Sequence, residues 1–220
     1  MKSFAWLIVC ALLLASACSS RQKPQPPPSS VAGMEKVLDV KDGEAWRKPG
    51  ATLADYDRFI LDPAQCRIPG YDPATASVPP DQLRILAEYF SRVLREAIPS
   101  DYPLVTSPGP RTLRITPIIT GVEPSNPVMN TITSVVPLGI VLSLAESAAT
   151  GKASYVGSAS VEIEFHDALS GELVGLYRGQ KDGEKYDSSG FSETGVARKA
   201  FEEWAQLLRR RIFTARGKTG

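Results

Sequence analysis

The sequence has few of the residues that build metal sites and disulfides. Its 220 residues include three cysteines and one histidine, whereas tetrahedral zinc sites take most of their ligands from those two residue types. We therefore expect no metal ion and no other cofactor. Net charge is almost absent as well, because 25 Lys and Arg face 24 Asp and Glu. A nucleic-acid partner is not expected, since no basic excess is available to meet phosphate groups.

Long apolar runs are also absent. The N-terminal run from Phe4 to Leu14 is shorter than the ~20 residues that a membrane-spanning helix needs. The basic Lys2 precedes this apolar run, and the small residues 15–17 separate the run from Cys18. This order of a basic, an apolar and a small-residue segment is typical of a secretory signal peptide. An ordinary secretory peptide cut after Ala17, with Cys18 a plain thiol, is the alternative.

Residues 15–18 (ASAC) resemble the signal of bacterial lipoproteins, although Ala15 stands where Leu is usual. The resemblance implies that residues 1–17 are removed and that Cys18 is lipidated with acyl chains such as palmitate. Ser19, in place of Asp, implies sorting to the outer membrane, with the domain on its periplasmic face. Two or three acyl chains hold a protein stably where one does not.

The mature chain is then a tether followed by one domain. Residues 18–33 contain the lipidated Cys18 and a Pro- and Ser-rich segment that favours an extended linker. We expect a single domain over 34–213 and a disordered tail over 214–220. Cys66 would be the one free thiol left, so no intramolecular disulfide is expected.

Hydrophobic periodicity predicts the elements of the domain. Apolar residues recur at helical spacing over 81–98 and 192–213, and strand patterns cover 56–62, 113–122, 158–166 and 172–178. These patterns predict an α+β fold of two layers: a mostly antiparallel sheet of about four strands, with two long amphipathic helices on one face.

The segment 135–149 (VVPLGIVLSLAESAA) is the most apolar part of the domain. Three interpretations stay open. We favour a helix buried against the sheet; the others are an exposed patch that binds an envelope protein or the membrane surface, and a membrane-inserting hairpin of an assembled pore.

Candidate catalytic groups lack a supporting pattern. Thr150-Gly151-Lys152 has neither the upstream Gly nor the following Ser or Thr of a phosphate-binding loop. Cys66 and His166 have no flanking signature of a nucleophile and its base. Asp62, Glu162 and Glu164 are the carboxylates on which a hydrolytic site would depend, but for Glu162 and Glu164 we favour a solvated strand face. The run Arg209, Arg210, Arg211 is predicted to be a solvated helix end, with contact to anionic lipid as the alternative.

Several segments together resemble a known family. They are 48–57 (KPGATLADYD) leading into 59–63 (FILDP), 101–105 (DYPLV), 121–127 (GVEPSNP), 133–137 (TSVVP) and 149–152 (ATGK). In this order they resemble the bacterial lipoproteins called domain of unknown function 3313, over about residues 35–210.

The resemblance implies no catalytic or binding residue, because the family's function is unknown. The sequence as a whole predicts a lipid-anchored envelope protein without catalysis that binds or assembles with other components. An envelope hydrolase with a carboxylate site and a self-assembling channel component are the alternatives.

Overall fold

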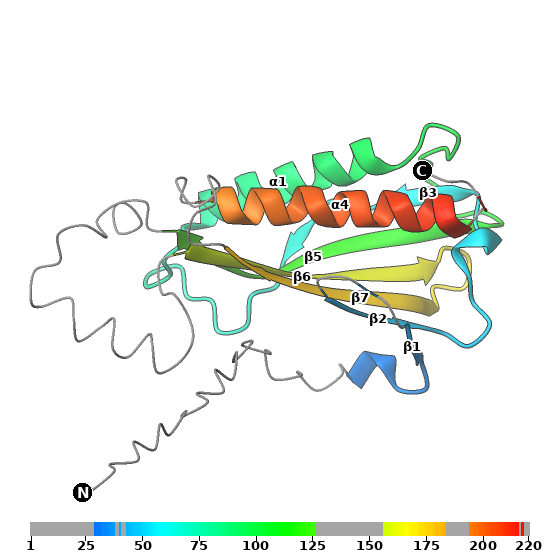
Figure 1. The fold of residues 1–220 in the computed structure, drawn as a ribbon, viewed down its shortest axis with the longest axis horizontal. Helices are drawn as coiled ribbons and strands as arrows, with labels where there is room; N and C mark the ends of the chain where they lie inside the picture. Colours follow the sequence, from blue (N-terminus) through cyan, green and yellow to red (C-terminus); the bar gives the residue numbers. More distant parts are fainter. Residues whose placement is uncertain are drawn as a thin grey trace, which may run out of the picture.

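A computed structural model describes residues 29–37, 40, 43–125, 156–183, 194–215 and 217. Their elements form one sheet with two long helices (Figure 1). In chain order they are η1 (Ser29–Val31), β1 (Glu35–Val37), β2 (Gly43–Arg47), η2 (Leu53–Asp55), β3 (Arg58–Leu61), β4 (Gln65–Cys66), α1 (Pro80–Ala97), β5 (Thr112–Ser125), β6 (Val156–Asp167), β7 (Leu173–Asp182) and α4 (Gly195–Ala215).

The predicted sheet was wrong in size and in strand direction. The described residues form a seven-stranded sheet in the order β1-β2-β7-β6-β5-β3, with β4 also pairing with β5. It is mixed, because β3 and β4 run parallel to β5 while the other neighbours are antiparallel. The four expected strands correspond to β3, β5, β6 and β7; the short strands β1, β2 and β4 were missed because two to five residues carry no periodic pattern.

The α+β class and both predicted helices agree with the structure. Helix α1 begins at Pro80 and ends before Ile98, and it buries Leu83, Leu86, Phe90, Val93, Leu94 and Ala97. Both helices lie side by side on one face of the sheet (Figure 1). The rings of Phe90 and Phe201 stack between them, with centroids 4.5 Å apart. Among the described residues, no helix combines the length and hydropathy that crossing a bilayer would require.

Strand β6 alternates as its sequence predicts. Ala159, Val161 and Ile163 are buried beneath the helices, whereas Glu162 and Glu164 point to the opposite, open face. The first described residues lie on that open face too. Val31 of η1 packs there against Trp46 of β2 and Leu176 of β7.

Pro117 lies inside the central strand β5, although a proline has no N–H for a strand ladder. Ile115 pairs with Leu61 of β3, and Ile118 pairs with Gln65 of β4. Pro117 therefore faces the break between these two strands. The sheet accommodates it because the neighbouring chain is itself interrupted there.

Candidate functional site

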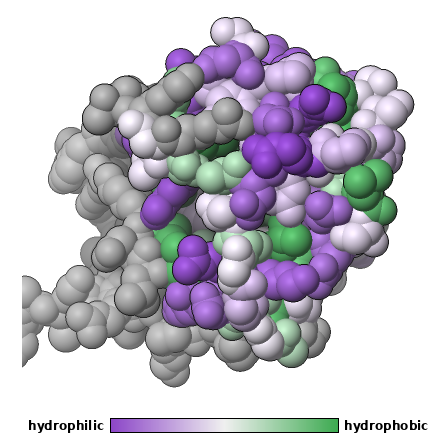
Figure 2. Space-filling view, turned by 90° about the vertical axis from the view of Figure 1, so that its right-hand side faces the viewer, coloured by the Kyte–Doolittle hydropathy of each residue, from purple (hydrophilic) through white to green (hydrophobic). Residues whose placement is uncertain are grey.

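An apolar pocket of about 310 Å³ lies between the sheet and the C-terminal half of α4. Its walls come from β2, η2, β5, β6, β7 and α4, and the aliphatic and aromatic residues that line it include Leu53, Phe165, Val174, Trp204 and Leu207. Pockets of a few hundred Å³ with mainly hydrophobic walls are the usual shape of small-molecule sites. Figure 2 views the end of the molecule toward which α4 runs; hydrophobic residues appear there as separate patches among hydrophilic ones.

Two paired glycines make room for the aromatic side chains of this pocket. Gly43 of β2 lies opposite Gly179 of β7. A Cβ at Gly179 would lie 2.7 Å from Trp204 Nε1, and one at Gly43 would lie 2.8 Å from the Tyr177 hydroxyl. Since real Cβ contacts are longer, the two glycines let the rings of Tyr177 and Trp204 lie directly on the sheet.

Trp204 places a buried indole N–H at the pocket. Its side chain is 3% exposed, and Nε1 has no hydrogen-bond partner within the described part of the chain. Tyr56, on another wall, hydrogen-bonds to Asp167 at the β6–β7 turn; burial and the nearby Asp167 raise the pKa of the Tyr56 phenol. The backbone N–H and hydroxyl of Ser170 donate to Asp167 and lower the pKa of its carboxyl.

Among the described residues, two charged side chains line the pocket, and both are arginines: Arg47 at the end of β2 and Arg211 near the end of α4. Both arginines lie toward the C-terminal end of α4. On β7, the residue that pairs with Arg47 is Gly175, which lies four residues before Gly179, the glycine that contacts Trp204. On α4, Arg211 follows Trp204 by two turns, or roughly 10 Å. Arg47 Nε is 3.6 Å from Glu35 Oε2, with both side chains about half exposed.

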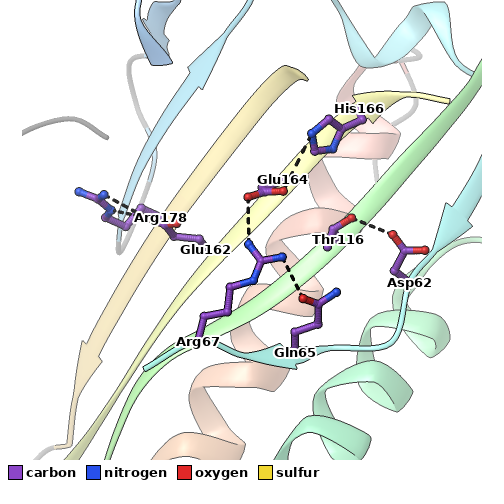
Figure 3. A network of polar contacts seen from close by, with 8 residues as sticks. All are labelled: Asp62, Gln65, Arg67, Thr116, Glu162, Glu164, His166 and Arg178. Carbon is purple, nitrogen blue, oxygen red and sulfur yellow. Dashed lines mark hydrogen bonds and ion pairs between the residues drawn. The ribbon is translucent and has the colours of Figure 1, made fainter. Parts of the chain in front are cut away.

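The carboxylates considered for hydrolysis lie on the open face of the sheet, away from this pocket (Figure 3). Glu162 Oε1 accepts a hydrogen bond from Arg178 Nε at 3.0 Å and lies 2.9 Å from Arg178 Nη2. Glu164 Oε1 is 3.6 Å from Arg67 Nη1, and its Oε2 is 3.9 Å from His166 Nε2. Each glutamate thus has its own basic neighbours.

Asp62 occupies the break between β3 and β4. Its Oδ2 accepts a hydrogen bond from Thr116 Oγ1 at 2.8 Å and lies 3.2 Å from Arg114 Nε. The candidate carboxylates are therefore spread along a charge-paired face rather than gathered around one point. Within the described ranges, no group of three or more His, Cys, Asp and Glu side chains is placed to hold a metal ion.

The structure does not bring Cys66 and His166 together. Cys66 pairs with Ile119 of β5, whereas His166 pairs with Arg114, a separation of about 16 Å along the strand. Cys66 Sγ lies 3.7 Å from the Leu83 carbonyl of α1, and partial burial of the sulfur raises the pKa of the thiol.

The three consecutive arginines of α4 were predicted to be one solvated helix end, but they have different surroundings. Arg209 donates to the Ala97 carbonyl at 3.4 Å. Arg210 lines a polar groove between α1 and α4, and Arg211 lines the apolar pocket. Successive residues of an α-helix point in directions about 100° apart. The three arginines are adjacent in the sequence and therefore face different surroundings.

The polar groove between α1 and α4 is held by charge pairs. The Tyr89 hydroxyl donates to Glu202, and Lys181 forms an ion pair with Glu203. The guanidiniums of Arg92 and Arg198 each lie 4.9 Å from the Tyr89 ring centroid. Cations and carboxylates alternate here, so the groove presents no single charge to a ligand.

Sequence reasoning missed the pocket, because Arg47, Trp204 and Arg211 come from distant elements. The one available signal was Trp46–Arg47, an aromatic and a cation in a segment without periodicity. Cys18, the apolar run 135–149 and residues 150–152 lie outside the described residues.

These features define an α+β domain with one helix-covered face, a charge-paired open face and an apolar pocket beneath its last helix. The chain belongs to the family described as protein of unknown function (DUF3313), which it matches over residues 29–208. That match confirms the family suggested by the sequence. No curated protein matches the chain.

The chain is similar to two solved structures of the PelC dodecamer from Paraburkholderia phytofirmans, one of which carries a Leu-to-Met substitution. Each is 14% identical in sequence, with a TM-score of 0.40, and the match covers 76% of this chain and 97% of that one. A similarity this distant has no bearing on the function or assembly of this chain.

Proposed function

We propose that this protein is a lipid-anchored lipoprotein of the cell envelope that works as a non-catalytic binding or assembly module. In this proposal Cys18 carries the acyl chains, and the domain faces the periplasm from the outer membrane. The observation that carries the binding role is the 310 Å³ pocket, whose described lining is apolar apart from a few hydroxyls, the Trp204 indole N–H and two arginines. These described walls suit the capture of an apolar group and supply no carboxylate or imidazole for acid–base chemistry.

Cell fractionation tests the anchor. We expect the native chain in the outer membrane and Cys18→Ala as an unprocessed or mislocalised precursor, since the thiolate is the only acceptor of the diacyl group. Cys66→Ala is the matched control and should fractionate like the native protein. Normal membrane partitioning and processing of Cys18→Ala would contradict the proposal.

Crosslinking in intact cells tests the binding role. We propose the apolar run 135–149 as the segment that contacts an envelope protein, because an apolar stretch of this length is unusual on a free surface. Photocrosslinking residues placed within 135–149 should recover an envelope protein, whereas one at the exposed Ala74 should not. Recovery of no envelope protein from any position would contradict the binding role.

A further inference from the structure

We propose that the pocket beneath α4 binds the anion of a medium-chain fatty acid, with the hydrocarbon tail inside and the carboxylate at Arg47 and Arg211. This inference rests on the proposed binding role and names the ligand of the same pocket. Size, shape and charge each support it.

The pocket is large enough for one acyl chain. An apolar cavity of about 150 Å³ accepts a benzene ring, and this pocket is about twice that volume, at 310 Å³. Roughly twelve carbon atoms fill such a space. A phospholipid with two chains is therefore too large, whereas dodecanoate fits.

The pocket is also elongated. Its lining on α4 runs from Trp204 to Ala215, and at 1.5 Å per residue this wall is about 16 Å long. The opposite wall follows β7 from Tyr177 to Val174 in the same direction. A linear chain lying along α4 contacts both walls over most of its length.

The two arginines determine which way the fatty acid lies in the pocket. Both arginines lie toward the C-terminal end of α4, and none of the described residues that line the pocket is acidic. Glu35 lies 3.6 Å from Arg47, but an ion pair between half-exposed side chains is weak in water. A carboxylate at this end is favoured because arginine binds it through paired, charge-assisted hydrogen bonds.

Photolabelling tests the ligand. The full chain in phosphatidylcholine vesicles is irradiated with dodecanoate that carries a diazirine at its terminal carbon, and the labelled peptides are identified. We expect label on the residues of α4 and β7 that line the pocket, with competition by dodecanoate and little competition by dodecanol. Equal competition by the two would overturn the anionic headgroup, and label confined to 135–149 would overturn the pocket.

Two matched pairs of variants locate the site. Ala51→Phe fills the pocket and should abolish labelling, while Ala74→Phe makes the same change at an exposed turn and should label normally. Arg211→Gln should weaken dodecanoate binding roughly 10-fold or more, while Arg210→Gln, which faces the polar groove, should not. Circular dichroism confirms that each variant is folded; native labelling in Ala51→Phe would overturn the proposal.

The outcome separates this inference from the proposed function. Absence of labelling in the native chain overturns the fatty-acid ligand, even where anchoring through Cys18 and crosslinking to envelope proteins proceed as expected. Loss of those two properties, in contrast, overturns the lipoprotein binding module whatever the pocket labels.

Discussion

Replacing Gly179 with alanine tests the packing that shapes the pocket. The added Cβ would lie 2.7 Å from Trp204 Nε1 and 2.9 Å from a ring carbon of Tyr177. Trp204 is 3% exposed and Tyr177 7% exposed, so neither ring can move into solvent without losing its buried contacts. The neighbours must therefore shift inside the core.

Overpacking of this kind costs about 1–3 kcal/mol of the free energy of unfolding. For a domain of this size each kcal/mol lowers the melting temperature by ~2–4 °C. We expect Gly179→Ala to melt roughly 2–12 °C below the native chain, measured by circular dichroism on the full chain in mild detergent.

The control is Gly109→Ala, where the nearest atom, Thr112 Oγ1, would be 3.5 Å from the new Cβ. That is an ordinary contact, so its stability should stay within ~0.5 kcal/mol of the native value. A melting temperature for Gly179→Ala equal to that of Gly109→Ala would refute the packing described above.

A second variant identifies which neighbour is responsible. Trp204→Phe removes the ring atoms closest to Gly179, so alanine should be tolerated better in that background. The double-mutant cycle should show a coupling of about 0.5–3 kcal/mol, as expected for residues in contact. Strict additivity would mean that the clash with Trp204 does not occur.

Three further outcomes are expected from the core and from two titrating groups. Phe90→Ala removes a fully buried ring and should lower the free energy of unfolding by ~3–5 kcal/mol, whereas Ile85→Ala on the exposed side of α1 should cost under ~1 kcal/mol; equal losses in urea titrations would contradict the burial. The pKa of Asp167 is lowered in the folded state, so its contribution is present above the ordinary aspartate pKa of ~3.9 and is lost as pH falls through the folded value. Asp167→Ala should therefore be less stable than the native chain at pH 7, by about 1 kcal/mol, and this difference should shrink below pH ~4; a constant difference would contradict the charge effect. The raised pKa of Cys66 predicts slower alkylation by iodoacetamide at pH 7.5 than a free thiol shows, with a steep rise at higher pH; a rate equal to that of free cysteine would contradict it.

The helices were predictable because each is long and has one apolar face. The six residues that α1 buries recur with the helical period of 3.6 residues, and Pro80 and Pro99 lie at the two ends of the helix. In α4 the same spacing relates the buried residues Ala197, Phe201, Trp204 and Leu208, whereas Leu207 is only partly buried. An apolar face of a helix is set by residues close together in the sequence, so the sequence alone is enough to predict it.

The strand directions of the mixed sheet were harder to predict, although the order of elements indicates one of them. The segments 58–61, 80–97 and 112–125 form a strand, a helix and a strand, and a helical connection of this kind joins parallel neighbours. The direction of β3 relative to β5 was therefore open to prediction. Strands β1 and β2 depend instead on distant partners, as in the pair Gly43 and Gly179, which local sequence does not specify.

The pocket was beyond prediction for the same reason. Trp204 lies on the apolar stripe of α4, but an apolar stripe in the sequence does not reveal where the opposing surface leaves space. That space depends on the two glycines and on the position of η2. Arg211 became distinguishable from Arg210 only once the rotation of α4 against the sheet was known.

The outer strands described above limit how two copies of this chain can associate. An edge strand with free backbone groups can pair with a strand of another molecule. At one margin, β1 has three residues, and Glu35 and Lys36 are charged. At the other, Phe59 of β3 already exchanges backbone hydrogen bonds with Pro103 and Val105. Neither margin of the described sheet offers a long template, so two copies that meet at these margins lack the strand on which a continuous intermolecular sheet would grow.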